Sequence, residues 1–313
     1  MLLAFCLTVL SIGYFLRLPA SPPDLISGEE LLRHYLCPLA LAIVVHLVLL
    51  ARSRSSRGSS GFILGVSIPT VIVATLCHFQ FKAWMPLINP HRYGRVYENV
   101  DQQFGFIVAL CTHFVAWMDR CGISVSDAYH GCFMILFFIC FGLHALYDSP
   151  IGQRQLMLGV GCILAFGGIC YWIAPAVGPF VYRHGADSHA TFIQMHMWQK
   201  FQSLVSTRHM PAGYFLMSPA AMPSLHVAHT AFFLWMLRRI SRPLSLLFLP
   251  VLLWFIATAI GLAWHYILDI PAGLLLAALA VLLVQRALPD PQDVISTETV
   301  SPEHAALEEP IPA

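Results

Sequence analysis

Charged residues are scarce in this chain. Only 11% of its 313 residues are Asp, Glu, Lys or Arg, whereas a soluble globular domain has roughly 25%. Hydrophobic residues make up 58%, and the mean hydropathy is +0.72. These values exclude an ordinary soluble domain and predict a polytopic helical membrane protein. The formal net charge of +1 gives no broad basic surface, so we expect no nucleic-acid partner.

Sequence motifs for metal binding are also missing. The nine cysteines form no C-x-x-C pair, and no H-E-x-x-H motif is present. Most cysteines lie inside apolar runs, which is typical of small side chains packed within a bilayer. We therefore expect neither a metal nor a cofactor. One zinc alternative stays open, because His226, His229, His265 and Asp269 together make a standard ligand set.

The apolar runs predict an all-α fold, a membrane bundle of about eight transmembrane helices plus one interfacial helix. The predicted spans are 1–16, 35–51, 61–79, 128–146, 156–174, 225–238, 245–264 and 269–286. No A-x-A cleavage site follows the first run, so we interpret it as a retained span. The run 104–118 is short and interrupted by His113, which favours an interfacial or re-entrant helix. We expect 180–222 to form a long polar loop on the bilayer surface.

Three regions are predicted: N-terminal transmembrane helices at 1–80, a second membrane domain at 81–287 that holds the motifs below, and a disordered acidic tail at 288–313. Arginines gather in three short loops, as Arg52, Arg54, Arg57, Arg154, Arg238, Arg239 and Arg242. With eight spans these loops share one side with both termini, and the positive-inside rule makes that side cytoplasmic. We predict a bacterial inner-membrane protein whose site lies on the periplasmic or luminal face.

Two stretches place ionisable side chains at the mouths of apolar segments, where they are costly unless they have a function. The first is Pro223-Ser224-Leu225-His226, and the second contains His265 and Asp269. Their spacing of four would set His265 and Asp269 on one helix face, where the carboxylate orients the imidazole as a nucleophile or base. His226 suits the acid, and Ser224 with the N–H groups of the following helix suits phosphoryl oxygens. Covalent phosphoryl or acyl transfer at a membrane surface is predicted.

These stretches resemble two motifs of the type-2 phosphatidic acid phosphatase superfamily. Pro223-Ser224-Leu225-His226 is similar to its P-S-G-H motif, and His265-x-x-x-Asp269 followed by Gly273 is similar to H-x-x-x-D-x-x-x-G. The resemblance implies that His265 attacks phosphorus to form a phosphohistidine. It also implies that Asp269 orients His265, that His226 protonates the leaving group, and that Ser224 contacts the phosphate.

The chain departs from the family pattern at three places. The first family motif, K-x-x-x-x-x-x-R-P, is not found, Ala259 replaces the arginine usual six residues before the third-motif histidine, and Leu225 replaces a glycine. With Tyr171, Pro175 and Pro179, these departures are similar to the inositol phosphorylceramide synthase branch. Members of that branch move a phosphoinositol head group from phosphatidylinositol to an acceptor lipid. The resemblance is sharpest over residues 170–275 and makes 81–287 the catalytic membrane domain.

The missing first motif leaves open which cation meets the phosphate. Arg183, Lys200 and Arg208 are the outer-loop cations nearest the motifs in sequence, and Arg183 is the preferred one. Asp101 either positions an acceptor polyol or caps the helix that begins near 104, and the cap is favoured. The expected partners are membrane lipids, a phospholipid donor and a lipid or polyol acceptor. The oligomeric state stays open.

Two other functions are retained as alternatives. A lipid phosphate phosphatase would use the same residues with water as the acceptor, and a non-catalytic lipid carrier or scaffold would keep only the fold. Without a catalytic role, His265 and Asp269 would be a structural pair at a helix end, and His226 an interfacial histidine. The presence of both stretches in one membrane chain favours catalysis.

Overall fold

The computed structural model describes residues 1–20, 37–52 and 57–289 of the chain. Every regular element in these ranges is a helix, as the apolar runs predict. Predicted features that fall on 21–36, 53–56 and 290–313 lie outside the described residues. They include Arg54, most of the first loop and nearly all of the acidic tail.

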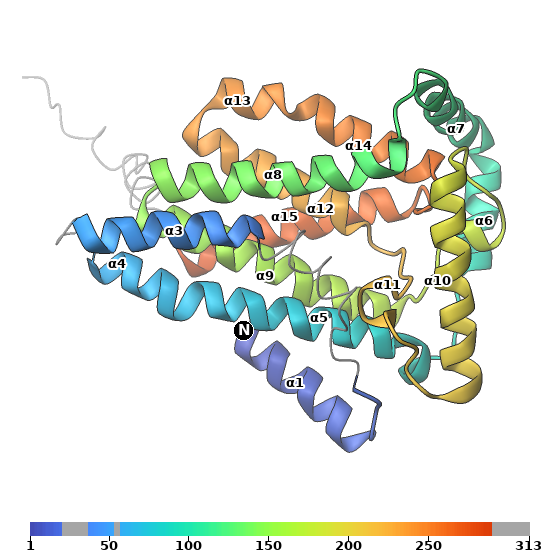
Figure 1. Cartoon of the computed structure of the whole chain (residues 1–313), viewed down its shortest axis with the longest axis horizontal. Helices are drawn as coiled ribbons and strands as arrows, with labels where there is room; N and C mark the ends of the chain where they lie inside the picture. Colours follow the sequence, from blue (N-terminus) through green and yellow to red (C-terminus); the bar gives the residue numbers. More distant parts are fainter. Residues whose placement is uncertain (21–36, 53–56, 290–313) are drawn as a thin grey trace, which may run out of the picture.

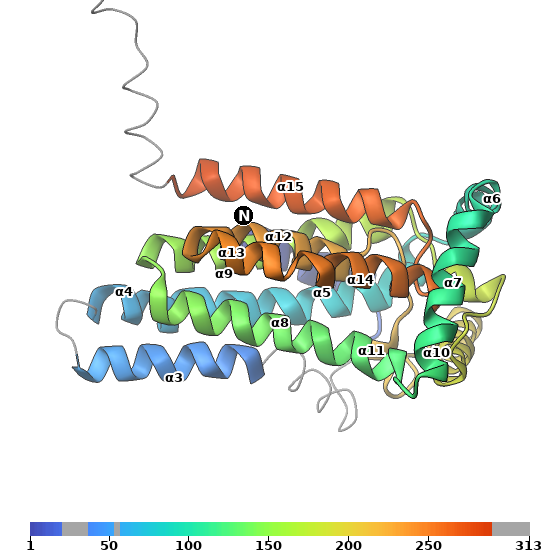
Figure 2. The same ribbon diagram turned by 90° about the horizontal axis from the view of Figure 1, so that it is seen from above.

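The long helices run roughly side by side in one bundle (Figures 1 and 2). They are α3 (Cys37–Arg52), α5 (Ile68–Ile88), α8 (Val125–Tyr147), α9 (Pro150–Ile173), α12 (Leu225–Ile240), α14 (Leu249–Gly261) and α15 (Asp269–Ala287). α9 is the central helix, because it packs against α5, α8, α12, α15 and also α1 (Leu2–Phe15). Helices α3 and α5 therefore share one core with the helices that carry the two motifs, and α1 packs against α5 in a smaller cluster of its own.

Among the residues that the structure describes, five helices are long and apolar enough to cross a membrane: Gly58–Ile88, Val125–Tyr147, Pro150–Ile173, Arg242–Gly261 and Asp269–Ala287. The apolar helices Leu2–Phe15 and Cys37–Arg52 are shorter. These helices identify an integral membrane protein. The count of about eight spans stays a prediction.

The third predicted span, 61–79, ends before the helix does in the structure. Helices α4 (Arg57–Phe62), η2 (Ile63–Ser67) and α5 follow one another without a break to Ile88. Phe81, Ala83, Trp84 and Met85 are buried, so the helix continues past the polar residue at 82. Lys82 thus lies within α5, one of the helices of the bundle.

Three helices lie across one end of the bundle: α6 (Gly94–Gln103), α7 (Gly105–Arg120) and α10 (Ser188–Thr207) (Figures 1 and 2). α7 contains the run predicted to be interfacial, and it exposes Phe106, Leu110 and Trp117. A crosswise helix with exposed apolar side chains is the arrangement that an interfacial helix requires.

The expectation of one long polar loop over 180–222 is wrong, because α10 occupies its centre. Asp187 caps this helix by accepting a hydrogen bond from the Ala190 N–H at 2.8 Å. The buried side chains recur every three or four residues, as Ala190, Gln194, Met197, Phe201 and Leu204. Three short elements complete the fold, η3 (Pro179–Val181), α11 (Tyr214–Met217) and α13 (Arg242–Leu247).

Candidate active site

A cavity of about 540 Å³ lies at the end of the bundle that α10 covers. Its walls come from the last turns of α5, the first turns of α8 and α12, one face of α10, and the segments 216–220 and 264–265. His226 and His265, which are 39 residues apart in the chain, both line it. The structure therefore brings the two predicted imidazoles to one cavity.

The backbone places His265 through a tight turn after α14. The helix ends at Gly261, and Ala263 adopts a left-handed conformation with φ of 58°. The carbonyl of Ala259 then accepts hydrogen bonds from the N–H groups of Trp264 at 3.0 Å and His265 at 3.1 Å. Ala259 is fully buried. The backbone carbonyl of Ala259 thus closes the turn that carries His265.

Two oxygen atoms hold the same nitrogen of His265. Its Nδ1–H donates to the carbonyl of Ala221 at 2.8 Å and to Oδ2 of Asp269 at 3.2 Å. Two acceptors at one nitrogen fix the tautomer with the proton on Nδ1. The lone pair is then on Nε2. An imidazole in this state has the form that a nucleophile needs.

His265 and Asp269 form a pair, but they do not lie on one helix face as their spacing predicted. His265 lies in the turn and not on a helix, whereas Asp269 is the first residue of α15. Oδ2 of Asp269 also accepts a hydrogen bond from the Tyr266 N–H at 2.8 Å. The carboxylate therefore holds both the imidazole and the backbone of the turn, and it is completely buried.

His226 projects from the first turn of α12 into a ring of aromatic side chains on α8. Its ring centroid is 4.6 Å from that of Tyr129 and 4.3 Å from that of Phe133. The ring of His130 lies 6.3 Å away, almost perpendicular to it. This setting holds His226 at the cavity wall beside a further imidazole.

The two predicted motifs contact each other directly. The Ser224 N–H donates to the Asp269 carbonyl at 3.1 Å. A Cβ on Gly273 would come within 2.6 Å of the Ser224 carbonyl oxygen, so only glycine permits this approach of α15 to α12. Ser224 itself is fully buried at the N-cap of α12 and is not part of the cavity wall. Its side chain therefore lies behind the wall to which His226 belongs.

The zinc alternative depended on His229 joining the other imidazoles. His229 is buried one turn further along α12, and its Nδ1–H donates to the Leu225 carbonyl of the same helix at 2.9 Å. Within the ranges that the structure describes, no group of three or more His, Cys, Asp or Glu side chains is arranged to hold a metal ion.

None of the four other predicted substrate contacts lines the cavity. Arg183 forms ion pairs with Glu98 and Asp101. The amine of Lys200 lies 3.8 Å from the Met217 sulfur, and Arg208 is exposed at the end of α10. The preferred interpretation of Asp101 as a helix cap is wrong, because the N-cap residue of α7 is Phe104 and no side chain makes a capping hydrogen bond there.

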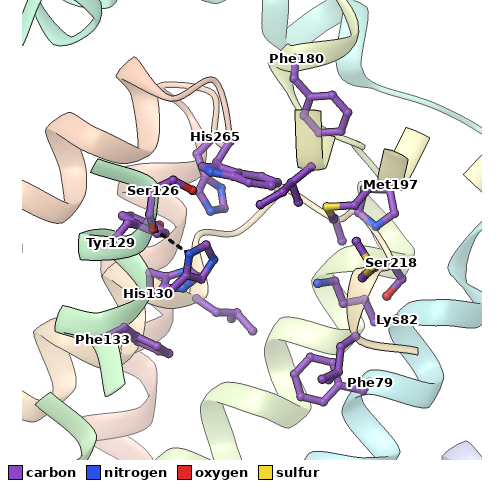
Figure 3. A pocket seen from close by; sticks show the side chains of 18 of the residues that line it. Phe79, Lys82, Ser126, Tyr129, His130, Phe133, Phe180, Met197, Ser218 and His265 are labelled. Carbon is purple, nitrogen blue, oxygen red and sulfur yellow. Dashed lines mark hydrogen bonds between the residues drawn. The ribbon is translucent and has the colours of Figure 1, made fainter. Parts of the chain in front are cut away.

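Sequence reasoning missed two residues that line the cavity, Lys82 and His130. Figure 3 shows Lys82 extending into the cavity from the wall opposite His130 and His265. Its amine lies 5.8 Å from the ring centre of Tyr171 and makes no ion pair with any residue that the structure describes. The Nδ1–H of His130 donates to the Ser126 carbonyl at 2.9 Å. A single lysine in an apolar stretch was the available signal for Lys82.

Comparison with protein families now decides the relationship. A family model described as the PAP2 superfamily matches residues 98–283, more than half of the chain. The chain belongs to the PAP2 superfamily. This membership fits a lipid phosphatase or phosphotransferase acting on membrane lipids. Comparisons with curated proteins and with solved structures find no match.

Membership in the PAP2 superfamily gives meaning to the spacing around Lys82. The first motif, K-x-x-x-x-x-x-R-P, has its counterpart in Lys82 followed by Asn89-Pro90, with asparagine in place of arginine. The amide of Asn89 donates to the Trp172 carbonyl at 2.7 Å, which ties the end of α5 to the end of α9. The spacing between Lys82 and Pro90 thus equals that of the lysine and proline in this motif, and Lys82 lines the cavity.

Proposed function

We propose that this PAP2 protein is a membrane lipid phosphotransferase that moves a phosphoryl-linked head group between lipids through a phosphohistidine on His265. One observation carries the proposal. The cavity that His226 and Lys82 line is also lined by His265, whose Nδ1–H is held by two oxygens, which leaves the lone pair on Nε2. A non-catalytic lipid carrier has no use for this arrangement.

The reaction has two steps that conserve protons. In the first, Nε2 of His265 attacks phosphorus, the bond from phosphorus to the lipid oxygen breaks, and His226 gives that oxygen a proton. In the second, the acceptor hydroxyl gives its proton to His226 and attacks phosphorus, and the phosphorus–nitrogen bond returns its electron pair to Nε2. The imidazole is cationic while it carries phosphorus. The carboxylate of Asp269, 3.2 Å from Nδ1, stabilises that charge.

Two positive elements face the phosphate in this scheme. Lys82 supplies a full charge from the opposite wall. The α12 helix supplies the partial positive charge of its N-terminus, where His226 is the second residue and no side chain caps the helix. Lys82 thereby replaces Arg183, Lys200 and Arg208 as the proposed phosphate cation.

The resemblance to the inositol phosphorylceramide synthase branch supports a transferase, with phosphoinositol as the proposed head group and a sphingolipid-type alcohol as acceptor. A lipid phosphatase is the second candidate, because water would use the same residues. Apolar side chains such as Phe79, Met134 and Met197 line part of the cavity. They favour a lipid alcohol over water as the acceptor.

The proposed orientation puts the site on the periplasmic or luminal face, with both termini in the cytoplasm. The arrangement of α8 and α12 supports it. Both helices begin at the cavity and end at the opposite end of the bundle, close to the arginine-containing short loops.

The test supplies purified protein with phospholipid carrying a radiolabelled head-group phosphate. We expect acid-labile label on histidine in the natural chain and none in His265→Gln. Transfer of the label to an added lipid alcohol identifies the transferase, and release to water identifies the phosphatase. Label that remains only on unreacted lipid would overturn the proposal. Loss of turnover with a chelator, restored by zinc, would replace the phosphohistidine scheme by a metal-dependent one.

A further inference from the structure

The turn that carries His265 is also held from its outer side, away from the cavity. Ile267 lies midway between His265 and Asp269, and its N–H donates to Oδ1 of Asp101 at 2.9 Å. Asp101 comes from α6, one of the crosswise helices, 166 residues earlier in the chain. Its carboxylate is almost completely buried, with 1% of the residue exposed.

The sequence of α6 explains why this carboxylate faces the turn. The buried residues of α6 are Gly94, Tyr97, Glu98 and Asp101, a helical stripe on one face. The ring of Tyr97 packs edge-on against that of Tyr266, with centroids 5.5 Å apart. Residues before and after His265 are therefore fixed by two different elements, α14 on one side and α6 on the other.

A buried carboxylate needs a partner for its charge. Arg183 provides it, with Nη2 on Oδ2 of Asp101 and Nη1 on Oε2 of Glu98. Each oxygen of Asp101 thus has a separate task, since Oδ2 binds the guanidinium and Oδ1 binds the backbone of the turn. A guanidinium occupied on both terminal nitrogens is poorly placed to bind a phosphate.

We infer that Asp101, with Arg183 and Glu98 behind it, is a positioning residue that holds the 265–269 turn so that His265 meets the substrate phosphorus. This inference rests on the proposed function and assigns to Asp101 and Arg183 a role other than the substrate contact expected from the sequence. A displacement of about 1 Å at a reacting group can cost about a hundredfold in rate. The cluster therefore acts on the rate of reaction and not on lipid affinity.

The first experiment compares Asp101→Ala with Asp101→Asn, and uses Asp119→Ala, an exposed carboxylate on α7, as the matched control. Asp101→Ala should lower kcat about a hundredfold with KM nearly unchanged, and should abolish hydrogen-exchange protection of the Ile267 amide. Asp101→Asn keeps an acceptor oxygen for that amide, so most of the protection and of kcat should return. A raised KM with unchanged kcat, or unchanged exchange in Asp101→Ala, would overturn the inference.

The second experiment tests whether Arg183 acts by neutralising the carboxylates of Asp101 and Glu98. Arg183→Ala leaves two buried carboxylates facing each other, so kcat should fall at least tenfold. Adding Glu98→Gln should then restore activity, because it removes the repulsion. A double variant as inactive as Arg183→Ala, with KM raised, would make Arg183 a phosphate contact. Hydrogen exchange needs no turnover, so it tests the positioning role even if the natural chain transfers no phosphate.

Discussion

Replacing Asp269 by asparagine separates the hydrogen bonds that this carboxylate makes in the turn from the negative charge that it places beside His265. Asparagine has the same shape and keeps an oxygen for the Tyr266 N–H, so the turn should retain its conformation. The proton also stays on Nδ1 of His265, because the Ala221 carbonyl accepts it at the shorter distance of 2.8 Å. The substitution therefore removes the negative charge and little else.

The magnitude follows from the distance between the charges. A full positive charge on the imidazole, 3.2 Å from the carboxylate oxygen, interacts by about 5 kcal/mol at an effective dielectric constant of about 20. With half a charge developed in the transition state, the interaction is about 2.5 kcal/mol. At 1.36 kcal/mol for each tenfold in rate, Asp269→Asn should slow phosphohistidine formation about 70-fold to about 5000-fold.

The assay is rapid-quench measurement of labelled phosphohistidine formed by the natural chain, Asp269→Asn and Asp269→Ala. Asp148→Asn is a matched control, because His144 and Asp148 form a similar pair, with 2.6 Å between Nδ1 and Oδ2, outside the cavity. Its rate should equal that of the natural chain. If Asp269→Asn formed phosphohistidine within threefold of the natural rate, charge stabilisation by Asp269 would be refuted.

Three further predictions concern charge and packing around the cavity. Lys82→Met removes the proposed cation and should lower kcat/KM about 10-fold to 150-fold, measured by lipid turnover, since a hydrogen bond to a charged group contributes about 1.5–3 kcal/mol. Gly273→Ala places a Cβ 2.6 Å from the Ser224 carbonyl and should destabilise the protein by about 1–3 kcal/mol in thermal unfolding, whereas Gly61→Ala, with no atom within 4 Å, should not. Burial raises the pKa of Glu98 against the opposing effect of Arg183. A raised pKa means that the folded state binds this proton more tightly than the unfolded state does. The stability gained in this way is complete below the ordinary glutamate pKa of about 4.3 and is lost as pH rises through the raised pKa. The Tm should therefore rise on acidification from pH 7 more in the natural chain than in Glu98→Gln.

The sequence predicted the helices of the bundle wherever an apolar run was uninterrupted. Helices α12, α14 and α15 agree with the last three predicted spans within a few residues, except where α14 ends before the turn that holds His265. α10 was missed because His189, His196 and Lys200 made the segment look like a polar loop. The spacing of Ala190, Met197 and Leu204 could nevertheless have indicated the buried face of a helix, and Asp187 could have been predicted as its N-cap.

The candidate site was predictable only in its side chains with distinctive chemistry. The motif spacing identified His226, His265 and Asp269, and the structure places the two histidines on one cavity with Asp269 behind His265. The Ala221 carbonyl has no sequence signature, because every residue carries one. Its role depends on the path of the chain before α12 and could not have been inferred.

The side chains that line the cavity come both from the region matched by the family model and from α5, which precedes it. The family match covers 98–283, which holds both histidines, yet Lys82 precedes it. α5 runs unbroken through the predicted region boundary at residue 80 and packs against α9 and α1. In the proposed mechanism the matched part therefore supplies the covalent and proton chemistry, and α5 supplies the full positive charge for the phosphate. The N-terminal helices then act as part of the enzyme, because the position of that charge depends on their packing.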